Sequence, residues 1–235
     1  MLRELTLGIA TLAIVPAASA TFIDFYCTSQ STTNSGQNLT VYTIWARFNG
    51  PTDTVLNAFN LAGVGASSMT GFWHKDNAYY NSGVLMQEYG TWNPSQTGSV
   101  TLNRPFDSFL TIGGQATPTN TTNADPSWVS GGNADARSWN RPDLPNNGTL
   151  GWFNSNPPNL QGRVGQPGNL ADSVRIGQFV LSANDGANRF YSLTLGYNNG
   201  VPGSAVQFGT GTFCMPSPGA VALFGLFGAS RRRGR

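Results

Sequence analysis

Short segments in which apolar and polar residues alternate most strongly limit how this chain can fold. In Leu39–Phe48 the alternation has the two-residue period of a β-strand. Val174–Ala183 and Asn188–Tyr197 repeat this pattern on either side of an Asn-Asp-Gly turn at 184–186, which is typical of a β-hairpin. From residue 21 to 213 no helical period is sustained for about ten residues, the length that separates helices from strands. We therefore expect an all-β domain.

The other candidate strands are also short and are separated by turn residues such as Asn, Gly and Pro. Residues 116–148 are a long polar stretch, which we expect either to contain a short hairpin or to be a functional loop. About 9 to 11 strands over residues 21–213 predict a β-sandwich, jelly-roll-like or cohesin-like. In chain order the predicted strands are Thr21–Cys27, Leu39–Phe48, Val55–Leu61, Met69–Trp73, Val84–Gln87, Asp107–Gly114, Thr149–Phe153, Val174–Ala183, Asn188–Tyr197 and Ala205–Phe213.

The composition is that of a folded domain with few charges. Charged residues make up 10% of the chain, well below the roughly 25% of an average soluble protein. Disorder does not follow from this low charge, because 6 Trp, 7 Tyr and 14 Phe supply large apolar surfaces that disordered segments lack.

The formal net charge of +2 comes from the ends of the chain. Five of the 13 basic residues are Arg3 and the four arginines of 231–235, and one of the 11 acidic residues is Glu4. Residues 21–218 therefore carry eight basic and ten acidic side chains, a net charge of −2. This body has no basic patch that could neutralise phosphates, so we exclude a nucleic-acid partner.

The first 20 residues are typical of a signal peptide. Arg3 precedes an apolar run from Leu5 to Val15, Pro16 ends the run, and small residues follow. The run is shorter than the roughly 20 apolar residues that a membrane-spanning helix needs. We predict that signal peptidase cuts between Ala20 and Thr21 and that the mature chain is exported.

Two cysteines remain in the mature chain, Cys27 near its start and Cys214 near its end. An even number of cysteines in an exported protein favours pairing, and we predict a Cys27–Cys214 disulfide. Such a bond would close almost the whole domain, which the loop-entropy model values at about 4–5 kcal/mol. The alternative is two unpaired, buried thiols.

Few residues offer catalytic or metal chemistry. His74 is the one histidine of the chain, and no Gly-x-Ser-x-Gly elbow or catalytic-cysteine pattern accompanies it. A single histidine also excludes the usual multi-histidine zinc and copper sites. Glu88 is the one glutamate of the body, and its aspartates mostly occupy turn positions. We expect no enzymatic activity and no cofactor; a hydrolase that uses His74 is the least favoured hypothesis.

Tryptophans beside the predicted loops suggest a ligand. In an extracellular β-sandwich, exposed aromatic rings on one face can stack against sugars, so an extracellular polysaccharide is a candidate partner. Packing in the core or at the rim is the alternative explanation for these rings. The candidate ligand aromatics are Trp73, Trp92, Trp128 and Trp139.

Residues 214–235 have the order of a sorting tail: a proline motif, an apolar run at 220–230 and an arginine cluster. This order resembles the PEP-CTERM sorting signal of exported bacterial proteins, with serine where the family usually has glutamate. The resemblance implies an exosortase-like transpeptidase as partner, a short hydrophobic helix as inner-membrane anchor, and arginines on the cytoplasmic side. Eleven helical residues span about 16 Å, about half of the bilayer's hydrocarbon core, so we expect a transient anchor. The motif is Pro216, Ser217 and Pro218, and the membrane stop is Arg231, Arg232 and Arg233.

Residues 49–60 and 107–113 also resemble segments of uncharacterised exported β-rich proteins that carry such tails. Taken together, these features predict an exported, non-enzymatic protein of the cell surface, envelope or extracellular matrix. The alternative is an extracellular carbohydrate- or matrix-binding module, which requires exposed, coplanar Trp or Tyr rings on one face.

Overall fold

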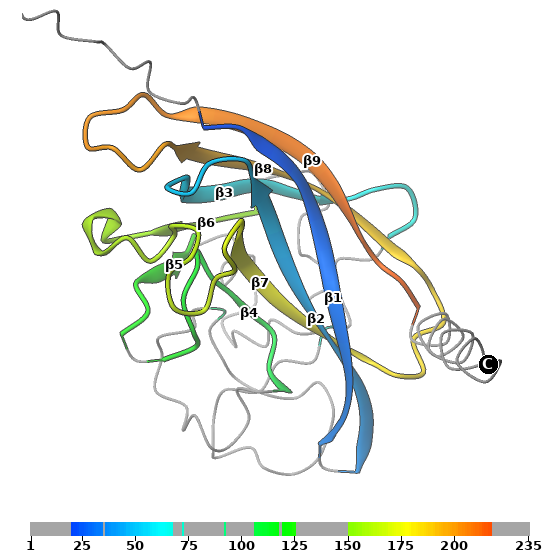
Figure 1. Ribbon diagram of the computed structural model, residues 1–235. Coiled ribbons are helices and arrows are strands. Elements are labelled where there is room, and N and C mark those ends of the chain that lie inside the picture. Colours follow the sequence, from blue (N-terminus) through cyan, green and yellow to red (C-terminus); the bar gives the residue numbers. More distant parts are fainter. Residues whose placement is uncertain are drawn as a thin grey trace, which may run out of the picture.

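The described part of the chain is built of two antiparallel β-sheets (Figure 1). A computed structural model describes residues 20–34, 36–67, 72, 92, 106–117, 119–125 and 150–217. One sheet has the strand order β1-β2-β7-β4 and the other has the order β5-β6-β3-β8-β9. The strands are β1 (Phe22–Asn34), β2 (Gln37–Phe48), β3 (Thr54–Gly63), β4 (Phe109–Leu110), β5 (Thr122–Ala124), β6 (Leu150–Asn154), β7 (Ser173–Ser182), β8 (Arg189–Asn198) and β9 (Gln207–Met215).

The predicted all-β class is confirmed in these residues, which contain no α-helix and include a 3-10 turn at Pro157–Asn159. The strand predicted at Leu39–Phe48 is β2, and the two strands of the predicted hairpin are β7 and β8. The hairpin prediction is wrong, because these two strands lie in different sheets and do not pair. The link between them is therefore a connection from one sheet to the other rather than a hairpin turn. No helix of the described ranges is long and apolar enough to cross a membrane.

One apolar core joins the inward faces of the two sheets. On β2 the alternating residues Tyr42, Ile44 and Ala46 are fully buried, because successive side chains of a strand point to opposite faces. Leu193 and Leu195 of β8 supply the same kind of surface from the other sheet. This alternation was the signal that identified both strands in the sequence.

The two sheets approach each other where β1 lies beside β9 (Figure 1). Two glycines of β9 make this approach possible. A Cβ atom at Gly209 would lie 2.6 Å from Cδ1 of Phe22, and one at Gly211 would lie 2.9 Å from Cδ2 of Phe25. The aromatic rings of β1 therefore fill the space that side chains at these two positions would occupy.

Some strands depart clearly from the prediction. β1 continues past Cys27 to Asn34, because Thr28 onward pairs with β2, although most side chains of 28–33 are exposed and show no apolar alternation. The predicted strand Asp107–Gly114 is reduced to the two residues of β4. The short β5 lies within the polar stretch 116–148. The strands predicted at Met69–Trp73 and Val84–Gln87 lie almost wholly outside the described residues.

The predicted domain boundaries fall at the edges of the described chain. Ala20 is buried, and the backbone N–H of Thr21 donates to Oδ1 of Asn49 (3.1 Å). β9 continues to Met215, two residues past the predicted end of the domain at 213. The hydroxyl of Tyr42 donates to the carbonyl oxygen of Pro216, so the chain is held against the body up to the proline motif. Residues 1–19 and 218–235 lie outside the described residues.

Candidate functional site

The outward face of the sheet β1-β2-β7-β4 carries a row of large side chains. Tyr26 of β1 pairs with Trp45 of β2, and Trp45 pairs with Arg175 of β7. Paired residues of antiparallel strands point to the same side of the sheet, so these three side chains lie next to one another. They face away from the core, because the inward positions of β2 on either side of Trp45 are Ile44 and Ala46.

A bulge in β7 aligns this row. Ile44 pairs with Gly177 whereas Trp45 pairs with Arg175, so Ile176 is an extra residue in β7. The extra residue allows Ile176 to point into the core while Arg175 stays beside Trp45 on the outer face. The local irregularity therefore decides that the arginine joins the aromatic row.

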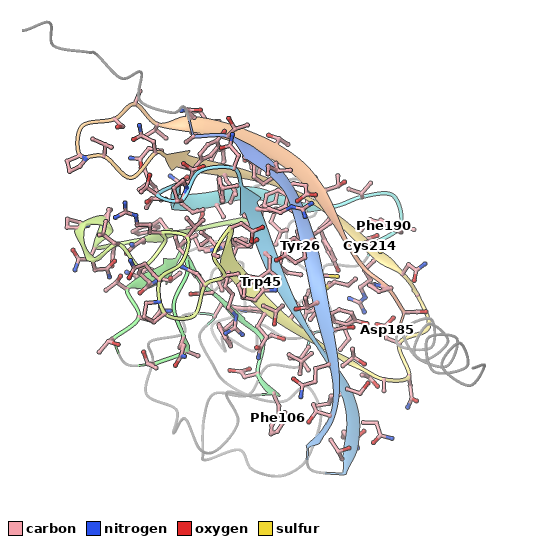
Figure 2. All side chains as sticks on the ribbon, viewed as in Figure 1. Tyr26, Trp45, Phe106, Asp185, Phe190 and Cys214 are labelled. Atoms are coloured by element: carbon pink, nitrogen blue, oxygen red, sulfur yellow. The ribbon has the colours of Figure 1, made fainter. Side chains whose placement is uncertain are left out.

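Tyr26 and Trp45 form a pair of nearly parallel rings that are partly exposed. Their ring centroids are 6.5 Å apart and their planes differ by 19°, and Figure 2 shows the two side chains on adjacent strands. Hydrogen bonds fix both rings: the Trp45 indole N–H donates to Oγ1 of Thr28 (3.1 Å), and the Tyr26 hydroxyl donates to Oγ of Ser173 (3.1 Å). The two rings are therefore held in nearly parallel orientations on this face.

An ion pair borders the aromatic pair. Nε of Arg47 lies 3.0 Å from Oδ1 of Asp24, and each side chain is 42% exposed. The Arg47 guanidinium also lies 5.6 Å from the centroid of the Tyr26 ring, a cation–π distance. Exposed ion pairs contribute little to stability, so this pair is better placed to offer polar atoms to a ligand.

At the other end of the row, the guanidinium of Arg175 has no acidic partner among the described residues. It lies 4.9 Å from the centroid of the Phe109 ring, and its Nη2 donates to Oε1 of Gln178. Its Nε is shielded from solvent and has no hydrogen-bond partner. Burial disfavours the charged form and lowers the pKa of Arg175 to about 10, so the side chain still carries its charge at neutral pH.

A hollow of about 450 Å³ lies beside Trp45 on this face. That volume is within the range of roughly 300–1,000 Å³ that is typical of small-molecule sites. Among the described residues of its lining, Arg175 is the charged one, and the others are polar, aromatic or aliphatic. The lining consists of Thr28, Ser29, Gln30, Val41, Thr43, Trp45, Arg175 and Gln178.

A second hollow, of about 510 Å³, lies at an end of the other sheet. It is lined by Thr54, Leu56 and residues of 157–163 and 198–202, most of them apolar. Its lining contains no aromatic ring against which a sugar could stack. We therefore place the candidate site in the smaller hollow, which has a tryptophan, an arginine and several hydrogen-bonding side chains.

The two cysteines are brought together from opposite ends of the domain. The thiol of Cys27 on β1 donates to the carbonyl oxygen of Cys214 on β9 (2.6 Å), and both residues are free thiols. Burial, and secondarily the nearby Cys214, raises the pKa of the Cys27 thiol to about 11. Burial also raises the pKa of Cys214. The disulfide itself stays a prediction.

Of the four tryptophans predicted to contact a ligand, Trp92 is described and is fully buried in the core. Its ring lies 6.1 Å from that of Phe72 and 6.2 Å from that of Phe179, so it packs the interior and offers no exposed surface. Trp73, Trp128 and Trp139 lie outside the described residues, as do His74, Pro218 and the arginines 231–233.

Sequence reasoning missed Trp45 and Tyr26 as candidate ligand aromatics. Trp45 lies in the most clearly predicted strand, on the face opposite Ile44, and that position was the available signal. The part of the chain that the structure describes holds no group of three or more His, Cys, Asp or Glu residues that could bind a metal ion. Comparison of the chain with protein-family models, curated proteins and solved structures finds no match.

Proposed function

We propose that this chain is an exported, non-enzymatic protein of the cell surface or extracellular matrix whose domain binds carbohydrate. In this proposal the two sheets form a jelly-roll-like or cohesin-like β-sandwich, and the ligand lies on the outer face of β1, β2 and β7. The sequence alone favoured a surface or matrix protein without an assigned ligand. The outward aromatic pair now brings the carbohydrate-binding alternative forward.

The observation that carries the proposal is the pair Tyr26 and Trp45. Sugar rings present C–H groups on their faces and hydroxyls around their edges, so they require a flat apolar surface with polar groups around it. The two nearly parallel rings provide the surface. Thr43, which lies in the adjacent register row, and the Arg47–Asp24 pair provide donors and acceptors around it. Among the described aromatic residues, this pair combines partial exposure with ordered, parallel rings.

Affinity electrophoresis in gels that contain soluble polysaccharides tests the binding. The purified chain is expected to be retarded by at least one polysaccharide, and the variant Trp45→Ala is expected to bind at least about tenfold more weakly, a loss of about 1.4 kcal/mol. The matched control is Phe208→Ala, which removes a 66% exposed aromatic from β9 in the other sheet. Equal retardation of Trp45→Ala and the unmodified chain would contradict the proposed site.

Export is proposed from the end segments of the chain. Signal peptidase removes residues 1–20, an exosortase-like transpeptidase recognises Pro216, Ser217 and Pro218, and Arg231, Arg232 and Arg233 stop transfer at the membrane. The end of β9 at Met215 supports this order, because a cut near the motif leaves the last strand whole.

Cell fractionation tests export. The chain is expected in the envelope or the medium, whereas a variant with Leu12→Asp and Ile14→Asp, which interrupts the apolar run, is expected to stay in the cytosol. Uncut chain that stays in the cytosol without these substitutions would contradict export.

A further inference from the structure

We propose that the hollow beside Trp45 binds the carboxylate of an acidic sugar, so that the ligand is a polysaccharide containing uronic acid. This inference rests on the proposed carbohydrate-binding function and specifies its substrate class. It starts from the charge in the hollow: Arg175 is partly buried and positively charged, and the lining residues that the structure describes include no carboxylate. A partly buried cation without an anionic partner is costly, and a bound anion would offset that cost.

Nε of Arg175 is shielded from solvent and Nη2 donates to Gln178, so the anion would approach the Nη end of the guanidinium. The Phe109 ring covers a face of the group, while hydrogen bonds of a guanidinium lie in its plane. The amide of Gln178 is itself fixed, because its Nε2 donates to the carbonyl oxygen of Asp107 (2.7 Å) and its Oε1 accepts from Arg175. The guanidinium is therefore held in one orientation, which suits planar, two-point binding of a carboxylate.

Neither Asp24 nor Asp172 forms an ion pair with Arg175. Asp24 forms an ion pair with Arg47, which lies on β2 two residues after Trp45. Asp172 accepts a hydrogen bond from the hydroxyl of Ser173 (2.8 Å). Burial lowers the pKa of Arg175, and no acidic group among the described residues counteracts this effect. The hollow therefore offers an anion a single, uncompensated positive charge.

The register places this charge at a suitable distance from the stacking surface. Trp45 and Arg175 are paired on adjacent strands, which lie roughly 5 Å apart. That separation is on the scale of one sugar ring and its exocyclic group. A uronic acid stacked on Trp45 can direct its carboxylate to Arg175 while its ring hydroxyls reach Thr28 and Thr43 in the next register row.

Isothermal titration with an oligosaccharide of uronic acid, and with the same oligosaccharide after reduction of its carboxyl groups, tests this inference. The full chain is expected to bind the acidic form at least about tenfold more tightly, because hydrogen bonds to charged groups contribute roughly that much. In Arg175→Gln the preference for the acidic form is expected to disappear, and in Arg175→Lys it should persist in part. The charge-matched control is Arg163→Gln, which removes an arginine of the second hollow and should leave the preference unchanged.

The outcomes separate the inference from the function on which it rests. Equal affinity for the acidic and the reduced oligosaccharide overturns the inference and leaves carbohydrate binding intact. An oligosaccharide of neutral sugars that carries sulfate groups serves as a second probe. If it binds as tightly as the uronic acid, the assignment of the ligand group as a carboxylate is overturned. Absence of binding to every sugar overturns both proposals. The comparison of the two ligands on the unmodified chain decides the matter even if Arg175→Gln fails to fold.

Discussion

Asn120 shows how single polar residues hold the loops around β7. The residue is 4% exposed. Its Nδ2 donates to Oγ1 of Thr111 (3.0 Å) and to the carbonyl oxygen of Gln115 (2.9 Å). Its Oδ1 accepts from the backbone N–H of Thr122 (2.9 Å) and from Nε2 of Gln161 (3.0 Å). A buried asparagine that uses both ends of its amide is a structural residue, because each lost bond would leave a buried group unpaired.

Replacing Asn120 with Ala is therefore expected to lower the free energy of unfolding by roughly 2–4 kcal/mol. The measurement is chemical denaturation, with Asn38→Ala as the control because Asn38 is exposed and its Oδ1 accepts one hydrogen bond, from Thr33 (3.2 Å). The control should stay within about 0.5 kcal/mol of the unmodified chain. Equal stability of the two variants would show that the buried network contributes nothing.

The sequence pattern could not predict the hydrogen-bond network around Asn120, although the residues of this network are common in turns. Thr111 and Asn120 belong to the connection 111–121, and Gln161 and Asn169 belong to the connection 155–172, so their contacts depend on where these two connections meet. Asn169 links the network to the candidate site, since its Oδ1 accepts from the backbone N–H of Arg175 (3.1 Å). Turn propensity describes local conformation and carries no information on such contacts.

At the scale of elements, the contact between β1 and β9 brings together the two cysteines of the predicted disulfide. Cys27 points toward the core, and its thiol meets the backbone of Cys214 rather than a sulfur atom. We propose that the two thiols join after export: each loses a proton and an electron to a disulfide-containing oxidant, which is reduced to its thiol form. Because burial raises the pKa of Cys27 to about 11, little thiolate exists at neutral pH, and a disulfide-exchange catalyst would accelerate the step.

Intact-mass measurement of the exported chain after alkylation of free thiols tests this cross-link. The chain is expected to take up no alkyl group without reduction and two after reduction, and Cys214→Ser is expected to take up one under both conditions. The disulfide should raise the free energy of unfolding by about 2–4 kcal/mol relative to the reduced chain. Two alkyl groups on the unreduced exported chain would contradict the proposal.

Strands whose side chains alternate between the core and the solvent were predicted well. Strands without this alternation were not. β2 and β7 have a buried face and matched their predicted ranges within one or two residues. From Thr28 to Thr33, most side chains of β1 are exposed. This part of the strand is therefore defined by its pairing with β2 and not by a hydrophobic pattern. The two-residue β4 has too little length to show any period.

At the scale of the whole molecule, the fold places functional side chains in a way that strand patterns only partly predict. The period of β2 predicts that Trp45 faces away from Tyr42 and Ile44, and the structure agrees. The arrival of Arg175 beside Trp45 depends on strand order and on the bulge at Ile176, which have no sequence signature here. Trp92 illustrates the converse, since a tryptophan expected near a loop packs in the core.

The indole N–H resonances of the tryptophans, followed by NMR during titration with an acidic oligosaccharide, test the central claim most directly. The Trp45 resonance, assigned with Trp45→Phe, is expected to shift, because its N–H lies on the outer face and bonds to Thr28. The Trp152 resonance is expected to stay in place, since that N–H is buried and donates to the carbonyl oxygen of Thr111 (3.1 Å). A titration in which the sugar binds while the Trp45 resonance does not move would contradict the proposed site.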